Sequence, residues 1–234
     1  MTFPSFLPFL GAEARARRLR AALLGAGLAA APALGPDAAA ALPLLSEVFY
    51  DAVGSDNGLS FVELWGAPGT SLDGLVIEGV NGGDGAVGPV LTLAGVIPAG
   101  GVFVVADESS AGATLVPGAH LVRNFDFQNG PDSIVLRAGA TVLDAIGYGV
   151  FAPGEIFAGE GAPAVDPPAG ESLARRFADV DTDDNAADWI ALAAPTPGSA
   201  PVAAVPEPGS AALLALGLSG LAGAGGRRRR PARP

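Results

Sequence analysis

The sequence predicts an all-β domain, a β-sandwich, held between two apolar ends. Short apolar or alternating segments recur at intervals of about ten residues between positions 44 and 192, which is typical of a sandwich. Turn residues separate these segments, in a chain that contains 34 glycines and 21 prolines. Between the two ends, no stretch of useful length has the 3.6-residue apolar period of an amphipathic helix.

The first two strands and the turn between them are the clearest elements. Residues 44–50 read as a strand, and the turn after it contains Asn57-Gly58, a pair that adopts positive φ easily. Residues 59–65 alternate in polarity, as a strand with two different faces does. The alternation places Phe61, Glu63 and Trp65 on one face and Val62 and Leu64 on the other.

Later segments predict the rest of the sandwich. A glycine-rich loop is expected at 79–88, a tight hairpin at 138–140 and a long Gly/Pro/Ala-rich loop at 149–170. Residues 195–204 read as a Pro/Ala-rich linker that holds the sandwich off the membrane. The remaining strands are expected at 72–78, 90–93, 102–106, 121–127, 133–137, 141–148, 171–177 and 188–192, so the domain runs from 42 to 194.

The N-terminal end has the order of a secretory signal peptide, which we assign to residues 1–41. Arg15, Arg17, Arg18 and Arg20 form a long basic region, and an apolar run of fourteen residues follows at 21–34. Small residues come next, so cleavage is expected near 39–41. An uncleaved membrane helix is the alternative, although the run is short for a span.

The C-terminal end, residues 205–234, has three parts in order: a short motif, an apolar run and a basic block. The run at 209–226 would span about 27 Å as a helix, close to the ~30 Å of a hydrocarbon core. Positive charge after it would keep the C-terminus in the cytoplasm and leave the domain outside. The motif is Val205, Pro206, Glu207 and Pro208, and the basic block is Arg227, Arg228, Arg229 and Arg230.

This arrangement resembles the PEP-CTERM sorting signal of Gram-negative bacteria, over residues 205–230. The resemblance implies recognition and cleavage by an exosortase, after transient anchoring in the inner membrane through a transmembrane helix. An ordinary tail anchor is the alternative.

Charge and composition limit the chemistry of the domain. Of thirteen basic and twenty-four acidic residues, nine and three lie in the two ends, which leaves four and twenty-one and a charge near −17. Such a surface repels phosphate backbones, so direct nucleic-acid binding is not expected. The chain has no cysteine, all thirteen basic residues are arginines, and His120 is its single histidine. Thiol, Schiff-base and His-rich metal chemistry are therefore excluded.

A second resemblance covers residues 44–199. The segments SEVFYDAVGSDNGLSFVELWG, LDGLVIEG, VIPAGGVFVVAD, NGPDSIVLRAGATVLDAIGYG and ESLARRFADVDTDDNAADWIALAAPTPGSA occur in that order. Together they resemble the lamin tail domain of bacterial secreted proteins, which implies a non-catalytic, immunoglobulin-like β-sandwich used for binding or structure. The residues that carry it are Glu63 in FVEL, Asp132, Asp144 beside Tyr148, Arg175 or Arg176, Asp188-Trp189, and the exit Pro195-Thr196-Pro197-Gly198.

The acidic segment at 179–188 is the candidate metal site. Its alternating carboxylates could wrap Ca²⁺ with oxygen ligands, although Asp184 and Ile190 stand where an EF-hand needs Gly and Glu. The alternative is a solvated turn whose side chains cap backbone amides. The candidate ligands are Asp179, Asp181, Asp183 and Asp188.

Two other patterns are weaker. Residues 83–88 spell GxGxxG, but a strand follows them rather than the helix that a dinucleotide site needs. The strand aromatics are expected in the core, with an exposed glycan-binding strip as the alternative.

The sequence as a whole predicts an exported, non-enzymatic envelope or matrix protein without a required cofactor. Its expected partners are the Sec machinery, an exosortase, and exopolysaccharide or other envelope proteins, and its mature domain would be periplasmic, on the cell surface or extracellular. A Ca²⁺-dependent adhesin or glycan-binding module is the alternative, and a carboxylate-based hydrolase is a more remote one.

Overall fold

A computed structural model describes residues 42–203 of the protein. The predicted signal peptide at 1–41, the sorting motif, the predicted transmembrane helix and the basic block lie outside the described residues. Within 42–203, no helix has the length and the apolar character needed to cross a bilayer.

The regular secondary structure of the described chain is almost entirely β, which confirms the all-β prediction. Its only helix is a single turn, α1 (Asn185–Asp188). The strands are β1 (Leu44–Phe49), β2 (Phe61–Trp65), β3 (Leu75–Asn81), β4 (Val87–Thr92), β5 (Val102–Asp107), β6 (Leu121–Arg123), β7 (Asp132–Ala138), β8 (Thr141–Tyr148), β9 (Ser172–Arg175) and β10 (Trp189–Leu192).

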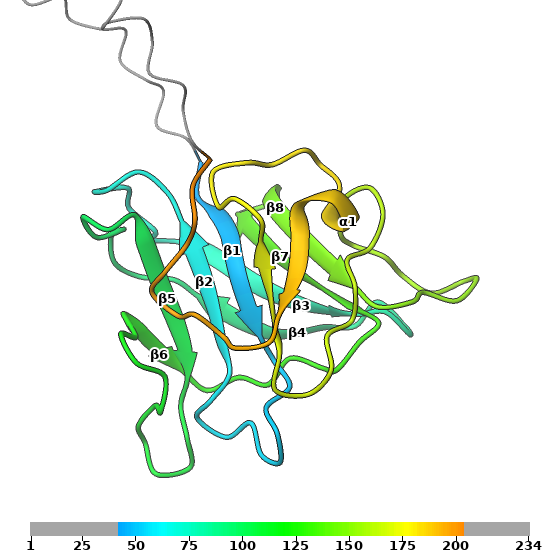
Figure 1. The fold of residues 1–234 in the computed structure, drawn as a ribbon, viewed down its shortest axis with the longest axis horizontal. Helices are drawn as coiled ribbons and strands as arrows, with labels where there is room; N and C mark the ends of the chain where they lie inside the picture. The colour runs from blue at the N-terminus through cyan, green and yellow to red at the C-terminus, as the bar shows by residue number, and fades with distance from the viewer. Residues whose placement is uncertain (1–41, 204–234) are drawn as a thin grey trace, which may run out of the picture. The chain divides into compact units, whose positions relative to one another are not determined.

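The strands form two sheets (Figure 1). One has six strands in the order β10-β9-β1-β2-β5-β6, and the other has four in the order β4-β3-β7-β8. All pairings are antiparallel except that of β5 with β6. The main core combines buried side chains of both sheets, such as Val62 and Leu64 of β2 with Ile134 and Leu136 of β7. The two sheets therefore pack face to face, as in a sandwich.

The alternation predicted for β2 is confirmed. Val62 and Leu64 face the main core, whereas Phe61 and Trp65 belong to a second apolar cluster on the other side of the six-stranded sheet. Glu63 shares that second side and is nonetheless fully buried. Something outside the sheet must therefore cover this face.

Residues 195–203 provide that cover. In Figure 1 this last described segment, in orange, runs back across the six-stranded sheet after β10. Ala200 packs against the second apolar cluster. The linker expected at 195–204 is thus, over residues 195–203, part of the packed domain; we call this segment the strap.

The strap returns the chain to the end of the sandwich where β1 begins (Figure 1). The N–H of Ala203 donates to Oδ1 of Asp179 at 2.6 Å. The neighbouring Val180 carbonyl and the Leu45 carbonyl both accept from the side chain of Arg175. The first and last described residues therefore lie at the same end of the domain.

The element bounds differ from the predicted ones mainly at β6, which ends at Arg123 rather than at 127, and around β3. β3 continues to Asn81 and β4 begins at Val87, so the expected glycine-rich loop shrinks to residues 82–86. Two antiparallel strands flank this turn and no helix follows it, so the GxGxxG pattern lacks the helix that a dinucleotide site requires.

Candidate functional site

The most concentrated group of charges in the described domain surrounds the side chain of Arg175, on β9. This side chain is completely buried. Its Nη2 lies 2.6 Å from Oδ1 of Asp144, and its Nη1 lies 3.1 Å from Oδ2 of Asp188 and 3.3 Å from Oδ1 of Asp181. The guanidinium also stands 5.1 Å from the ring centre of Trp189, within cation–π range. We call these groups the Arg175 network.

Asp144 connects the two sheets through this network. It lies on β8 of the four-stranded sheet and is completely buried. One of its oxygens accepts from Arg175 of the six-stranded sheet, and the other accepts from the Leu45 N–H at 2.6 Å. Burial raises the pKa of Asp144 to about 6, and Arg175 and the Leu45 N–H oppose that increase. Both oxygens of this carboxyl group thus accept hydrogen bonds from within the domain.

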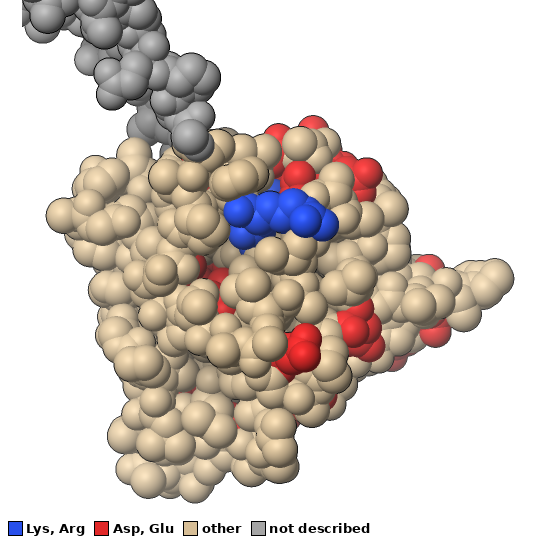
Figure 2. Space-filling view, in the orientation of Figure 1, with Lys and Arg blue, Asp and Glu red and all other residues tan. Residues whose placement is uncertain are grey.

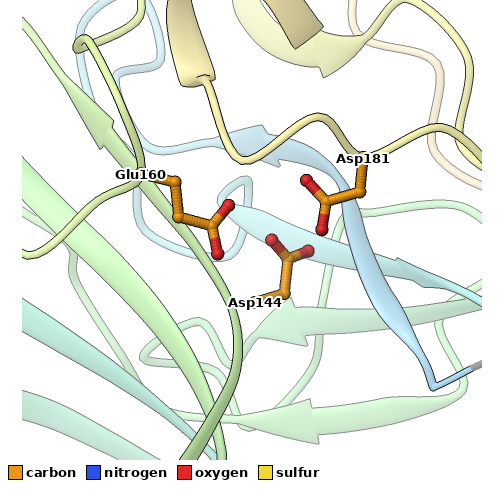
Figure 3. A group of neighbouring side chains, drawn as sticks. All are labelled: Asp144, Glu160 and Asp181. Atoms are coloured by element: carbon orange, nitrogen blue, oxygen red, sulfur yellow. The ribbon is translucent and has the colours of Figure 1, made fainter.

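Glu160 adds a further carboxyl group, one oxygen of which has no hydrogen-bond partner. The carboxylate oxygens of Asp144, Glu160 and Asp181 lie within 4.8 Å of one another, and the three side chains point toward a common centre in Figure 3. Oε2 of Glu160 is inaccessible to solvent and has no hydrogen-bond partner. Burial, followed by the charges of Asp144 and Asp181, raises the pKa of Glu160 to about 7.

This trio offers oxygen atoms of the kind that hard cations bind, but few of them are free. Arg175 and Leu45 use both oxygens of Asp144, and Arg175 also uses one oxygen of Asp181. A Ca²⁺ ion takes six to eight oxygen ligands, and here it would compete with a guanidinium already in place. A proton on Glu160 removes one negative charge without displacing Arg175. The trio therefore fits a proton better than a metal ion.

The four predicted calcium ligands are divided between different tasks. Asp181 and Asp188 meet at Arg175, and Asp188 also accepts from the N–H and the hydroxyl of Thr182. Asp179 instead accepts from Ala203 at the end of the strap. Asp183 is exposed and has a positive φ of 54°. The structure therefore brings two of the four together, around an arginine.

The rest of the acidic segment caps backbone amides. Asp184 is the N-cap of α1, and its side chain accepts from the Ala186 N–H. The Asp183 N–H in turn donates to Asp181. These contacts match the solvated, self-capping turn that the sequence offers as the alternative to a calcium loop.

A pair of buried carboxylates lies under the strap. Glu47 of β1 and Glu63 of β2 stand opposite each other in the sheet, and they are only 1% and 0% exposed. Strap N–H groups reach both of them: Thr196 donates to Glu47 at 2.8 Å, and Gly198 donates to Glu63 at 2.7 Å. Burial raises the pKa of Glu63 to about 7, while the hydrogen bonds from Ser46 and Gly198 oppose that increase.

Two further buried polar side chains fasten loops to the four-stranded sheet. Asp132 accepts from the N–H groups of Gly82 and Gly130. Asn185, which the sequence analysis did not single out, accepts from Gly147 and Glu160 and donates to the Ala145 carbonyl. It is completely buried, and its one sequence signal is its place directly after a capping aspartate.

Most of the strand aromatics are buried, as the sequence predicts, and the features that follow are on the surface. His120 is exposed, stacks on Phe103 and accepts from the Val104 N–H through Nδ1. An apolar hollow is lined by Phe151 and Phe157. Their ring centres lie 5.1 Å apart, with one ring edge-on to the other. Figure 2 shows scattered acidic groups on one face of the domain, with a single basic stretch beside α1.

The comparison with known protein families concerns the C-terminal end. Residues 204–230 match the PEP-CTERM protein-sorting motif, and this range includes every predicted residue of the motif and of the basic block. No curated protein matches the chain. The predicted sorting signal is therefore confirmed: the chain carries a C-terminal sorting tail, which marks an exported protein as a substrate of an exosortase.

Proposed function

We propose that this exosortase substrate is a non-enzymatic envelope or matrix protein, whose β-sandwich is a binding or structural module of the lamin-tail type. A signal peptide would deliver it through the Sec machinery. Its tail would hold it briefly in the inner membrane until cleavage releases it toward the exopolysaccharide layer or other envelope proteins. The single observation that carries this proposal is the sorting tail at 204–230.

The non-enzymatic part of the proposal draws support from where the charged groups point. Asp144, Arg175 and Asp188 are buried and bound to one another across the sheets. Catalytic groups need access to a substrate, which these three lack. A carboxylate hydrolase would need another pair of acids.

The lamin-tail part draws support from the residues that carry the resemblance. Glu63 binds the strap, and Asp132 binds two turns. The ion pair of Asp144 with Arg175 connects the two sheets. Of the two arginines left open by the sequence, we propose Arg175, because the side chain of Arg176 reaches only the Ala187 carbonyl at the surface. Residues with such internal roles suit a stable module that presents its outer surface to a partner.

Mass spectrometry of the native protein tests the proposal. We expect the surface or extracellular fraction to contain a chain that begins near residue 42 and ends near Pro208. A strain without its exosortase should instead retain the tail in the membrane fraction. Recovery of the full-length chain from the cytosol would contradict export, and an intact tail in both strains would contradict processing.

The second candidate, a Ca²⁺-dependent adhesin or glycan-binding module, is favoured by a different observation. Asp183 leaves an exposed carboxylate at the turn, and the hollow lined by Phe151 and Phe157 offers aromatic surface. Aromatic faces suit the apolar faces of sugars. Binding of the mature domain to exopolysaccharide with and without Ca²⁺ separates the two candidates, because only the second requires the ion.

A further inference from the structure

The strap, residues 195–203, is bound to the sandwich near its beginning by two carboxylates. Oγ1 of Thr196 donates to Glu47 at 2.7 Å, and its N–H donates to the same side chain. The Gly198 N–H donates to Glu63, and Gly198 has a φ of 89°, which L-residues rarely adopt.

The other end of the strap is bound as well. The Pro201 carbonyl accepts from Ala178 at 2.7 Å, and Asp179 accepts from Ala203 at 2.6 Å. Between the two ends, Ala200 packs on the second apolar cluster, and Pro195 and Pro197 line a hollow with ring carbons of that cluster. The strap is therefore docked from its first residues to its last.

The docked strap restricts the sorting motif by simple chain length. Only residues 204 and 205 separate Ala203 from Pro206, so Pro206 can stand at most about 10 Å from the docked end. A domain of this length has a radius of gyration of about 15 Å, which is larger than this reach. With the strap released, the chain from Leu192 to Pro206 could extend to about 48 Å.

We propose that the strap regulates processing of the sorting tail, by keeping the motif within about 10 Å of the docked end until the strap undocks. This inference rests on the proposed function, since it concerns how the exosortase reaches its substrate. A protease cleft must take in several residues on each side of the bond that it cuts. On the N-terminal side of the motif those residues are the strap, and they bind the sheet instead.

The test uses the full chain in detergent micelles, with a release variant and a matched control. Gly198→Pro removes the N–H that binds Glu63, and proline cannot adopt the local φ of 89°. Gly154→Pro makes the same change at another Pro-Gly turn, where φ is 99° and nothing surrounds the Cβ position. A second release variant, Asp179→Ala, loses the bond to Ala203, whereas Asp179→Asn keeps an acceptor oxygen there.

Two measurements follow from these variants. Amide hydrogen exchange of Thr196 and Ala203 should be slowed in the wild-type chain. About tenfold of this protection should be lost at Thr196 in Gly198→Pro and at Ala203 in Asp179→Ala. Thermolysin, which cuts before apolar residues, should cleave before Val202 about tenfold faster in the release variants than in either control. Exchange of the β1–β2 amides monitors the fold in every variant.

The outcomes separate this inference from the proposed function. Unprotected strap amides in the wild type, or equal cleavage rates in release and control variants, would overturn the role of the strap. Failure of an exosortase to process any of the chains in cells would contradict the proposed function, while the exchange and thermolysin results would still decide about the strap. Faster processing of the release variants in cells would support both.

Discussion

Replacement of Arg175 by methionine is the sharpest test of how the domain is held together. The change removes the guanidinium and leaves Asp144, Asp181 and Asp188 close together without a counter-charge. It also leaves the carbonyls of Leu45 and Val180 without a donor. Removal of one partner from a buried ion pair costs about 3–5 kcal/mol. We expect a loss at the upper end of that range, because several acceptors lose their donor at once.

The assay is thermal and urea unfolding of the purified protein, followed by circular dichroism. For a domain of this length, each kcal/mol lowers Tm by about 2–4 °C, so the expected decrease is about 10–20 °C. Arg176→Met is the matched control, since it removes the same charge one residue away and breaks only a surface bond to Ala187. The control should lose less than about 1 kcal/mol.

A double-mutant cycle then assigns the loss to the buried pair. Asp144→Asn keeps most of the shape of the side chain but removes the charge that faces Arg175. The double variant should lose at least about 1 kcal/mol less than the sum of the two single variants. If Arg175→Met costs no more than Arg176→Met, or if the two losses add, the Arg175 network does not tie the sheets together and our reasoning fails.

Three other predictions concern acidity, calcium and a loop anchor. Because the pKa values of Glu63 and Glu160 are raised from 4.5 to about 7, the folded state binds more protons than the unfolded state between these values. Tm should therefore decrease as the pH is raised from 5 to 8, and an increase would contradict the prediction. Millimolar Ca²⁺ should leave Tm unchanged, because Arg175 already holds the inward carboxylates of the segment at 179–188; an increase of several degrees would favour the adhesin. Asn185→Ala should cost about 3 kcal/mol in urea unfolding, since it removes the hydrogen bonds to two buried backbone groups and one half-buried group, whereas exposed Asn124→Ala should cost under about 0.5 kcal/mol.

Local pattern was enough to predict the strands. In β2, Val62 and Leu64 alternate with Phe61 and Trp65, and a period of two assigns such side chains to opposite faces whatever the rest of the chain does. The tight hairpin between β7 and β8 follows in the same way from its spacing. The same period on β9 places Arg175 on the face of buried Leu173, a signal that could have decided between the two arginines.

Contacts between distant residues explain what the sequence did not predict. Glu63 is covered by residues more than a hundred positions away, so its burial depends on how the chain returns after β10. The strap was interpreted as a linker because proline and alanine are common in linkers, and nothing local marks Thr196 and Gly198 as donors to buried carboxylates. The trio of Asp144, Glu160 and Asp181 likewise joins three separate segments.

The position of the two ends of the domain, together at one end of the sandwich, has a practical consequence for engineering. Residues 42 and 203 could be joined to adjacent positions of an exposed turn in an unrelated host protein, and the host chain would not have to spread apart. For the same reason a short peptide could link residue 203 to residue 42, with new termini opened at the exposed turn around Gly154. The sandwich is thus suited to insertion at a single exposed turn of a host protein.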